Sequence, residues 1–402
     1  MGKKWCVLLG LLLIFSFPLA AQKPTVLLIA ATADEALAFQ AVSNELTKRS
    51  VPHSLVGIGV ANPLLAQNPR SFSLRGGCHV RVPIHKNAWP TTQRLPEGDL
   101  MRVSTCLAPR LVLVGTHSRV QAQLAALFRK KNARVIAFYD DFEPPSAQSV
   151  AGAIIPYAHT ILLSQETHTK TFQELLPKTP LVVTGNPKHE AWEGQDPGDL
   201  MIVKRQIIPC THLNKKVILY IKGSNTRSND TFEEFLAYIK SRQDVVALFA
   251  PPPGDQGAKE EAFARMYGAT NFIVVPSGYA LKTIARAADI VLCHRTHLGI
   301  EAALAGLPVA YFDTQQGVFK NPLTAAGLIP ILHDAPALHK FIEGHTPVPN
   351  KQAALSRKAL GTSVGATARM ADCLMEALHK SAPVSGFEKL PWQSPGELRI
   401  PF

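Results

Sequence analysis

The feature that most constrains the fold is a rhythm of short apolar runs that alternate with helical segments and start afresh near the middle of the chain. Clear examples are Leu111–Val114 in the first half and Lys216–Ile221 in the second. Runs this short and this apolar are typical of strands buried on both faces of a parallel sheet. Strands that alternate with helices form α/β domains, so the restart predicts two doubly wound domains.

The same pattern gives expected bounds for most elements. In the first half we expect strands at Lys23–Ala30, Ser54–Val60, Leu111–Val114, Val135–Phe138, Ile161–Ser164 and Leu181–Thr184, and helices at Ala33–Arg49, Ser118–Lys131 and Thr167–Leu176. In the second half we expect strands at Lys216–Ile221, Val245–Phe249, Phe272–Val275, Ile290–Cys293 and Val309–Phe312, and helices at Thr231–Arg242, Lys259–Tyr267, Leu281–Ala287 and Gln352–Lys380. The proline-rich segment Ala61–Met101 is expected to be a long loop, and Gly152–Tyr157 to contain a short strand.

The two ends of the chain fall outside these domains. Lys3 and Lys4 precede an apolar run, Trp5–Leu19, which is followed by Ala20 and Ala21. This pattern predicts that residues 1–21 are a cleaved signal peptide or an uncleaved signal-anchor, so the protein would be exported to the periplasm or outside, or be anchored in the membrane. We expect domains at 22–205 and 206–380, with the junction near 197–213, and an extended tail at 381–402.

Composition narrows the class of partner. The chain has 402 residues, of which 46% are hydrophobic and 18% charged, which favours well-filled cores over disorder. The formal net charge of +12 suits anionic partners such as phosphates or a membrane surface. The basic residues are scattered, without a basic stripe interleaved with aromatic residues, so we expect no nucleic-acid partner.

The cysteines and histidines give weaker indications. Five cysteines remain after Cys6, so at least one of them is free or pairs between chains. A Cys78–Cys106 disulfide is conceivable if the protein is exported. The spacings of His79 with His85 and of His159 with His168 do not resemble zinc sites, so we expect no metal.

The segment Ala288–Phe312 carries the most specific pattern. An apolar strand leads into a helix that Thr296 is placed to cap, Gly306 to end and Pro308 to stop. Glu301 shares a helix face with Leu298 and Leu304, at offsets of three. A carboxylate on such an apolar stripe is costly unless something pairs with it.

This segment resembles the donor-nucleotide motif of GT-B glycosyltransferases and of their relative, UDP-N-acetylglucosamine 2-epimerase. The resemblance implies that Glu301 hydrogen-bonds a ribose and that amides of Thr296, His297, Leu298 and Gly299 face a diphosphate, with Arg295 beside them. The start of a helix favours a phosphate. His297 departs from the family, in which many members have Ser or Thr here. An ordinary βαβ unit with a surface glutamate is the alternative.

Two further segments support the resemblance. Thr184-Gly185-Asn186-Pro187 ends a strand, as a similar sequence does where the first domain closes in the epimerases and several sugar transferases. Its alternative is a plain turn. The turn 222–227 follows a strand, and a Gly-Ser loop stands here in many family members, so Gly223, Ser224 and Thr226 become candidates for phosphate binding. The chain has neither a Walker pattern nor GxGxxG.

Candidate catalytic residues follow two strands of the first domain. His117 comes after Leu111–Val114, and Asp140, Asp141 and Glu143 come after Val135–Phe138. The carboxyl ends of parallel strands open to the same side, where ligands of such folds bind. A GT-B enzyme that inverts configuration needs a base for the acceptor hydroxyl, and these side chains are of the right kind. A solvated acidic loop is the alternative.

The sequence therefore predicts two Rossmann-like domains facing across a cleft, the first on the acceptor side and the second on the nucleotide side. The leading functional hypothesis is a glycosyltransferase that uses a nucleotide sugar as substrate, without a resident cofactor, and acts on an envelope glycan or lipid. Two alternatives stay open. An exported GT-B protein can have lost catalysis and bind a glycan or another partner, since nucleotide sugars are cytosolic in bacteria. A nucleotide-sugar 2-epimerase is the other, although its His-Arg motif is not recognisable around His294.

Overall fold

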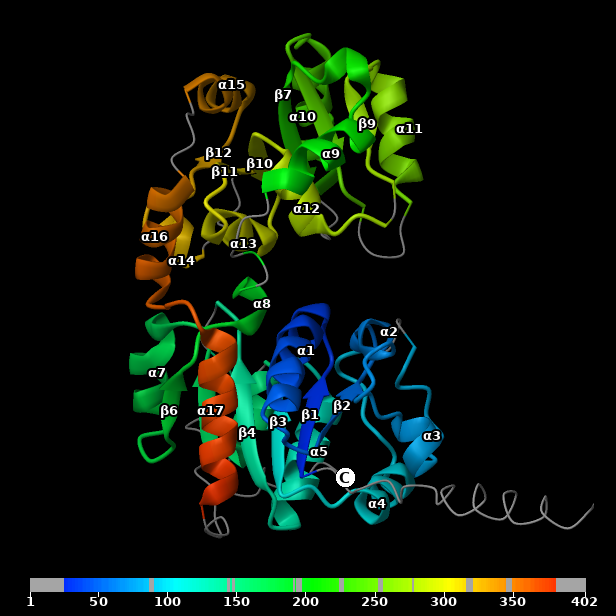
Figure 1. Ribbon diagram of the computed structural model, residues 1–402, viewed down its shortest axis with the longest axis vertical. Helices are drawn as coiled ribbons and strands as arrows, with labels where there is room; N and C mark the ends of the chain where they lie inside the picture. Colours follow the sequence, from blue (N-terminus) through cyan, green and yellow to red (C-terminus); the bar gives the residue numbers. More distant parts are fainter. Residues whose placement is uncertain are drawn as a thin grey trace, which may run out of the picture.

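The computed structural model describes residues 25–86, 90–142, 145–146, 149–190, 192, 197–223, 228–251, 256–276, 278–315, 321–344 and 349–380. The chain forms two α/β domains, one above the other in Figure 1. The predicted signal segment, residues 1–21, and the predicted tail, residues 381–402, lie outside the described residues.

The first domain is built on a six-stranded parallel sheet with the order β2-β1-β3-β4-β5-β6. Its strands are β1 (Val26–Ala30), β2 (His53–Gly57), β3 (Leu111–Val114), β4 (Arg134–Tyr139), β5 (Thr160–Leu163) and β6 (Leu181–Val183). Its helices are α1 (Ala33–Lys48), α2 (Ala61–Leu65), α3 (Leu74–Cys78), α4 (Glu97–Cys106), α5 (Arg119–Lys130), α6 (Ala151–Ile154) and α7 (Thr169–Leu175), with 3₁₀ turns at Ile155–Tyr157 and Glu166–His168.

The second domain repeats this plan with the strand order β12-β11-β10-β7-β8-β9. Its strands are β7 (Lys216–Ile221), β8 (Val245–Phe249), β9 (Phe272–Val274), β10 (Ile290–Cys293), β11 (Val309–Phe312) and β12 (Ile331–Leu332). Its helices are α9 (Pro197–Ile207), α10 (Ser228–Lys240), α11 (Ala258–Tyr267), α12 (Leu281–Ala287), α13 (Leu298–Leu304), α14 (Pro322–Ala325), α15 (Ala335–Gly344) and α16 (Pro349–Leu360), with a 3₁₀ turn at Cys210–His212.

Both sheets are buried on both faces, which is why their strands are apolar at nearly every position. Successive residues of β1 and β3 enter two separate apolar clusters, one on each face of the first sheet. The second sheet is divided in the same way. Apolar area removed from water contributes about 25 cal/mol per Å², so these four clusters are the main source of stability.

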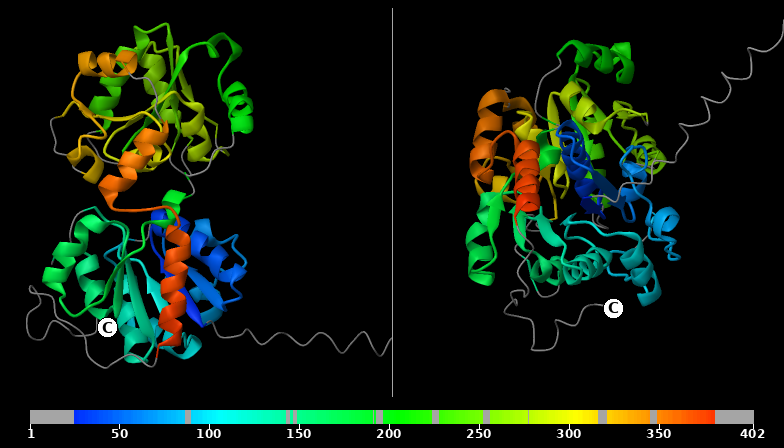
Figure 2. Two further views of the ribbon diagram at one scale, coloured as in Figure 1. Left: turned by 60° about the vertical axis from the view of Figure 1, so that its left-hand side comes forward. Right: turned by 60° about the horizontal axis from the view of Figure 1, so that its bottom comes forward.

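The chain passes between the domains twice. It first crosses through the short helix α8 (Pro187–Glu190), and it returns through the last helix, α17 (Ala366–His379). Figure 2 shows α17 lying along the first domain. Met370, Ala371 and Leu374 belong to the apolar cluster on the α1 face of the first sheet. The C-terminal helix is therefore part of the N-terminal domain.

The structure differs from the expected elements in several places. The expected loop 61–101 contains α2, α3 and the start of α4, and the segment expected to hold a strand, 152–157, is helical. The expected helix 352–380 is two helices, because Gly361 and Gly365 between them have left-handed backbones. The crossing at 184–192 precedes the expected junction, since α9 packs against α12 of the second domain.

Two further features of the described chain concern a disulfide and the lengths of the helices. Cys78 and Cys106 form a disulfide, with their Cα atoms 5.3 Å apart, which ties α3 to α4. Within the described ranges, the helices are all too short or too polar to traverse a lipid bilayer.

Candidate functional site at the domain junction

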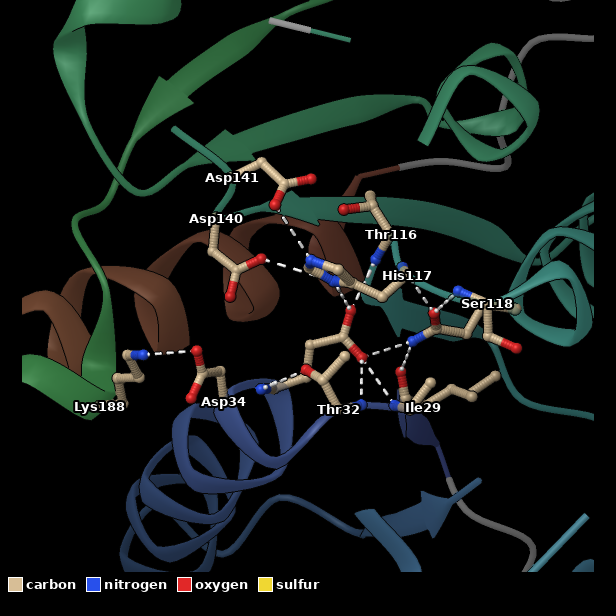
Figure 3. A network of polar contacts seen from close by, with 12 residues as sticks. Ile29, Thr32, Asp34, Thr116, His117, Ser118, Asp140, Asp141 and Lys188 are labelled. Carbon is tan, nitrogen blue, oxygen red and sulfur yellow. Dashed lines mark hydrogen bonds and ion pairs between the residues drawn. The ribbon is translucent and has the colours of Figure 1, made fainter. Parts of the chain in front are cut away.

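Figure 3 shows a polar network at the carboxyl ends of β1 and β3, around His117, Thr116 and Thr32. The buried side chain of Glu35 is its anchor. It lies in the first turn of α1, where Thr32 and Glu35 form a capping box. Its Oε2 accepts the Ala31 N–H at 2.6 Å, and its Oε1 accepts the Thr116 N–H at 2.7 Å. Gln121 Nε2 donates to Oε2 at 2.8 Å. These donors fix the carboxylate rigidly although it is fully buried.

His117 lies directly over this carboxylate. Its Nδ1 is 2.8 Å from Glu35 Oε1 and 3.7 Å from Asp140 Oδ1, and its Nε2 is 3.2 Å from Asp141 Oδ1. Burial alone would lower the pKa of His117, but Asp140 and Glu35, together with the hydrogen bond to Asp141, raise it to about 12. The imidazole is therefore a cation at neutral pH and cannot act as a base there.

Asp140 and Asp141 follow β4 and differ in environment. The Asp140 side chain is 5% exposed, and burial raises its pKa to about 7, against the lowering effect of His117. The Asp141 side chain is 41% exposed. Burial tends to raise the pKa of Asp141, but the hydrogen bond and charge of His117 hold it below its usual value. Two neighbouring carboxyl groups with separated pKa values are a common arrangement for acid–base chemistry.

Lys188 and Glu301 form a second buried group, which joins the two domains. Lys188 Nζ lies 2.6 Å from Glu301 Oε1 and 2.7 Å from Asp34 Oδ2. Burial would lower the pKa of Lys188, but the two carboxylates raise it above its usual value. Burial raises the pKa of Glu301, while Lys188 and a hydrogen bond from Trp192 oppose the rise. The carboxylate singled out in the sequence thus has a cationic partner in the crossover segment.

Other side chains close the same junction. The ring of His297, which precedes α13, lies 4.6 Å from the ring of Phe142, which follows β4. Burial lowers the pKa of His297, and Lys188 lowers it further. Burial and Lys188 also lower the pKa of His189, to about 3, so this imidazole is neutral. The carboxyl ends of β1, β4 and β10 therefore meet at one place.

The predicted phosphate loop of the second domain lies partly outside the described residues, which include Gly223 but neither Ser224 nor Thr226. A Cβ on Gly223 would lie 2.3 Å from the His294 carbonyl oxygen, so close packing of the ends of β7 and β10 explains this glycine. Arg295 has a left-handed backbone, with φ of 45°, and its Nε is 2.7 Å from Asp313 Oδ2.

The residues around α13 follow the expected turn with one change. The helix begins at Leu298 with His297 at its N-cap position and without a side-chain cap, so the expectation that Thr296 caps it is wrong. The Leu298 N–H makes only a long contact of 3.4 Å with Thr296 Oγ1. A Cβ on Gly299 would lie 2.6 Å from the Tyr311 hydroxyl. Gly306 has a left-handed backbone, with φ of 79°, as a glycine that ends a helix requires.

The structure brings His117, Asp140 and Asp141 together, and it brings His297 and Glu301 to the facing edge of the second domain. Glu143 lies outside the described residues. Sequence reasoning missed Glu35 and Lys188. The capping-box pattern of Thr32 and Glu35 could have singled out Glu35. The position of Lys188 directly after Thr184–Pro187 could have singled out Lys188.

Glu35, His117 and Asp140 also form a group that could hold a metal ion, with one ligand atom from each lying within 4.8 Å of the others. The expectation of no metal rested on the spacing of histidines along the sequence. Sequence spacing does not detect a site whose ligands come from three separate segments of the chain.

Similar proteins were found by structure alone. No family model and no curated protein matches this sequence. A putative UDP-N-acetylglucosamine 2-epimerase from Listeria monocytogenes is 14% identical, with a TM-score of 0.63, 91% of this chain covered and 100% of that chain. The Neisseria meningitidis UDP-GlcNAc 2-epimerase bound to UDP-GlcNAc is 15% identical, with a TM-score of 0.63 over 89% of this chain and 100% of that one.

MurG from Acinetobacter baumannii is 16% identical, with a TM-score of 0.53 over 88% of this chain and 100% of its own. At these identities the likeness concerns the fold. The match covers both domains and agrees with the two parallel sheets and the crossover described above. The chain has the two-domain GT-B fold that these epimerases and glycosyltransferases share.

Proposed function

We propose that this protein binds a nucleotide sugar at the domain junction and transfers the sugar to an envelope glycan or lipid. The observation that carries the proposal is the position of Asp140 and His117 in the first domain, opposite His297 and Glu301 of the second. An acid–base group and a candidate nucleotide segment are thereby placed on the two sides of one junction. This is the arrangement that transfer from a nucleotide donor requires.

Asp140 is the proposed base for the acceptor hydroxyl. With a pKa of about 7 it is partly ionised at neutral pH and strong enough to accept a proton. His117 is held as a cation by Glu35 and Asp141, so its proposed part is to position and stabilise the ionised form of Asp140. Asp141 keeps a low pKa and stays ionised.

Glu301 is the proposed ribose ligand, with His297 and Gly299 beside the diphosphate. This role requires Glu301 to exchange its contact with Lys188 for ribose hydroxyls. Lys188 would keep its contact with Asp34, 2.7 Å away, so the exchange does not strand a buried ammonium group. Gly223, Ser224, Thr226, Arg295 and Thr296 stay predicted contributors to the nucleotide site.

A nucleotide-sugar 2-epimerase is a second candidate. That chemistry needs several carboxylates and a histidine near the anomeric carbon, and Glu35, Asp140, Asp141 and His117 form such a group. A binding protein without catalysis is the third candidate.

Export or membrane anchoring of the chain also belongs to the proposal. The Cys78–Cys106 disulfide supports it, because disulfides persist in oxidising compartments.

The test is to incubate the full chain with UDP- and CDP-sugars and follow the sugar by NMR, with and without glycan and lipid acceptors. Transfer or slow hydrolysis of the donor supports a transferase. Inversion at the sugar C2 supports the epimerase. Asp140→Asn should reduce turnover about 10²–10⁴-fold, the usual contribution of general acid–base catalysis.

Asp372→Asn is the matched control, since Asp372 is an exposed carboxylate on α17 paired with Arg49. It should turn over like the wild type. Binding of a nucleotide sugar without any change in the sugar would leave the binding-protein reading in place and contradict both enzyme proposals.

A further inference from the structure

Asp140 Oδ1 is an oxygen atom whose surroundings leave it incompletely satisfied. The Asp140 side chain is 5% exposed, and Oδ1 has no hydrogen-bond partner among the described residues. A buried carboxylate oxygen without a hydrogen bond is costly even with the His117 ring 3.7 Å away, so it calls for a closer partner than the described residues supply.

We propose that Glu35, His117 and Asp140 hold a divalent transition-metal ion of the Mn²⁺ to Zn²⁺ class. One carboxylate oxygen from each acid and one imidazole nitrogen converge here, all within 4.8 Å of one another. Metal bonds of about 2.1 Å at right angles place neighbouring ligand atoms about 3 Å apart. The separations of His117 Nδ1 from Glu35 Oε1 and Asp140 Oδ1, 2.8 and 3.7 Å, bracket that value.

The free electron pairs at the site fit such an ion. Glu35 Oε2 already accepts from Ala31 and Gln121, whereas Oε1 accepts one backbone N–H, from Thr116, and otherwise faces only His117. A carboxylate oxygen has two acceptor positions, so Oε1 offers one to an ion. Asp140 Oδ1 offers both of its own.

Asp141 sets the tautomer that a metal ligand needs. Its Oδ1 lies 3.2 Å from His117 Nε2, so Nε2 can keep its proton while Nδ1 turns a lone pair toward the two acids. A carboxylate behind a metal-binding histidine is the usual outer-shell arrangement. The ion would replace the proton that Nδ1 otherwise carries, and this proton would leave to solvent.

Donor chemistry and access indicate the class of ion. Carboxylates suit Mg²⁺, Ca²⁺ and Mn²⁺, while imidazole suits Zn²⁺ and other transition metals. A site of two carboxylates and one imidazole therefore favours Mn²⁺, Zn²⁺ and the transition metals between them over Mg²⁺ and Ca²⁺. The His117 side chain is 25% exposed, which leaves a face for entry and for further ligands. The inference goes beyond the proposed function, which requires no metal: with an ion bound, Asp140 and His117 serve as its ligands, and activation of the acceptor hydroxyl would pass from Asp140 to the ion. A bound ion would also lower the pKa of a hydroxyl placed on it.

The test uses the full chain after chelator treatment and dialysis. Manganese added stepwise should lose its free EPR signal until one ion per chain is bound, and Zn²⁺ should then displace it. Asp141→Asn should weaken binding about 10–100-fold, as loss of an outer-shell partner does, and Asp140→Asn by more than that. Asp372→Asn, on the exposed surface, should bind like the wild type.

A second measurement does not depend on any variant folding. Pulsed EPR of the bound Mn²⁺ should show nitrogen coupling from a directly bound imidazole. The proposal is overturned if the wild type binds neither Mn²⁺ nor Zn²⁺ stoichiometrically, if the bound ion shows no imidazole nitrogen, or if folded Asp140→Asn binds like the wild type. None of these readouts depends on a nucleotide, so they are independent of the proposed function.

Discussion

At several positions of the junction, the space left by neighbouring side chains determines which residue type can be accommodated. Gly115 is the clearest case, because the Glu35 carboxylate occupies the space next to its Cα. The network around His117 exists only because a residue without a side chain lets Glu35 come this close. The sequence showed the glycine but not this reason, since Glu35 is eighty positions earlier in the chain.

Gly115→Ala should therefore destabilise the protein by about 1–3 kcal/mol, the usual cost of forcing extra atoms into a packed site. A Cβ there would lie 1.8 Å from Glu35 Oε1, which the Thr116 N–H and His117 hold in place. Gly98→Ala is the control, because Gly98 is exposed on α4 and its new Cβ would meet only the end of the Arg102 side chain, at 3.9 Å. Urea unfolding compares the two, and equal stability of both variants would contradict the close packing.

His189 gives a prediction on pH at the same scale. Its folded pKa of about 3 lies below the usual 6.5, so between these values the unfolded chain binds more protons than the folded one. Stability from this group is full above about pH 6.5 and is lost as pH falls toward 3. His189→Gln should lose less stability than the wild type between pH 7 and 5 in urea unfolding. A variant with the same acid loss as the wild type would show that His189 titrates normally.

Contacts between elements of the two domains hold the junction together. Lys188 of α8 connects α1 of the first domain with α13 of the second, and it is the part of the site that a sequence reading could least supply. The position of Glu301 on an apolar stripe of its helix indicates that its carboxylate needs a partner. The identity of that partner depends on how two domains dock, and no local pattern encodes this.

Glu301→Gln should cost about 1–3 kcal/mol in the ligand-free protein, because the buried Lys188 ammonium group loses one of its two carboxylate partners and keeps only Asp34. Both side chains are at most 6% exposed. Glu261→Gln, whose carboxylate is exposed and paired with Arg265, should change stability by less than about 0.5 kcal/mol. Chemical unfolding of both variants measures the loss in the free energy of unfolding. A loss in Glu301→Gln as small as that in the control would mean that Glu301 is hydrated and unpaired.

At the scale of the whole molecule, the fold followed from the sequence more closely than the site did. Strands such as β3 and β10 matched their expected ranges, because burial on both faces leaves an unbroken apolar run. The return of α17 to the first domain was not foreseen. An amphipathic helix shows that it needs an apolar surface, but the sequence does not show which of two sheets provides it.

The docking of α17 predicts that the first domain depends on the end of the chain. Leu374→Ala should destabilise the protein by about 2–5 kcal/mol, because its side chain is fully buried against the first domain. Leu355→Ala on α16 is the control, since Leu355 is 39% exposed and should cost far less. Thermal unfolding of both variants measures the difference. Equal costs would mean that α17 does not pack on the first sheet in solution.

The central claim is that a nucleotide sugar binds at the junction with Glu301 on its ribose. The most direct measurement is the melting-temperature shift of the full chain with UDP- and CDP-sugars, for the wild type, Glu301→Gln and Lys188→Gln. Binding to the folded state raises the melting temperature. The wild type should shift, Lys188→Gln should keep the shift because Glu301 is still present, and Glu301→Gln should lose most of it. No shift in the wild type, or an unchanged shift in Glu301→Gln, would contradict the claim.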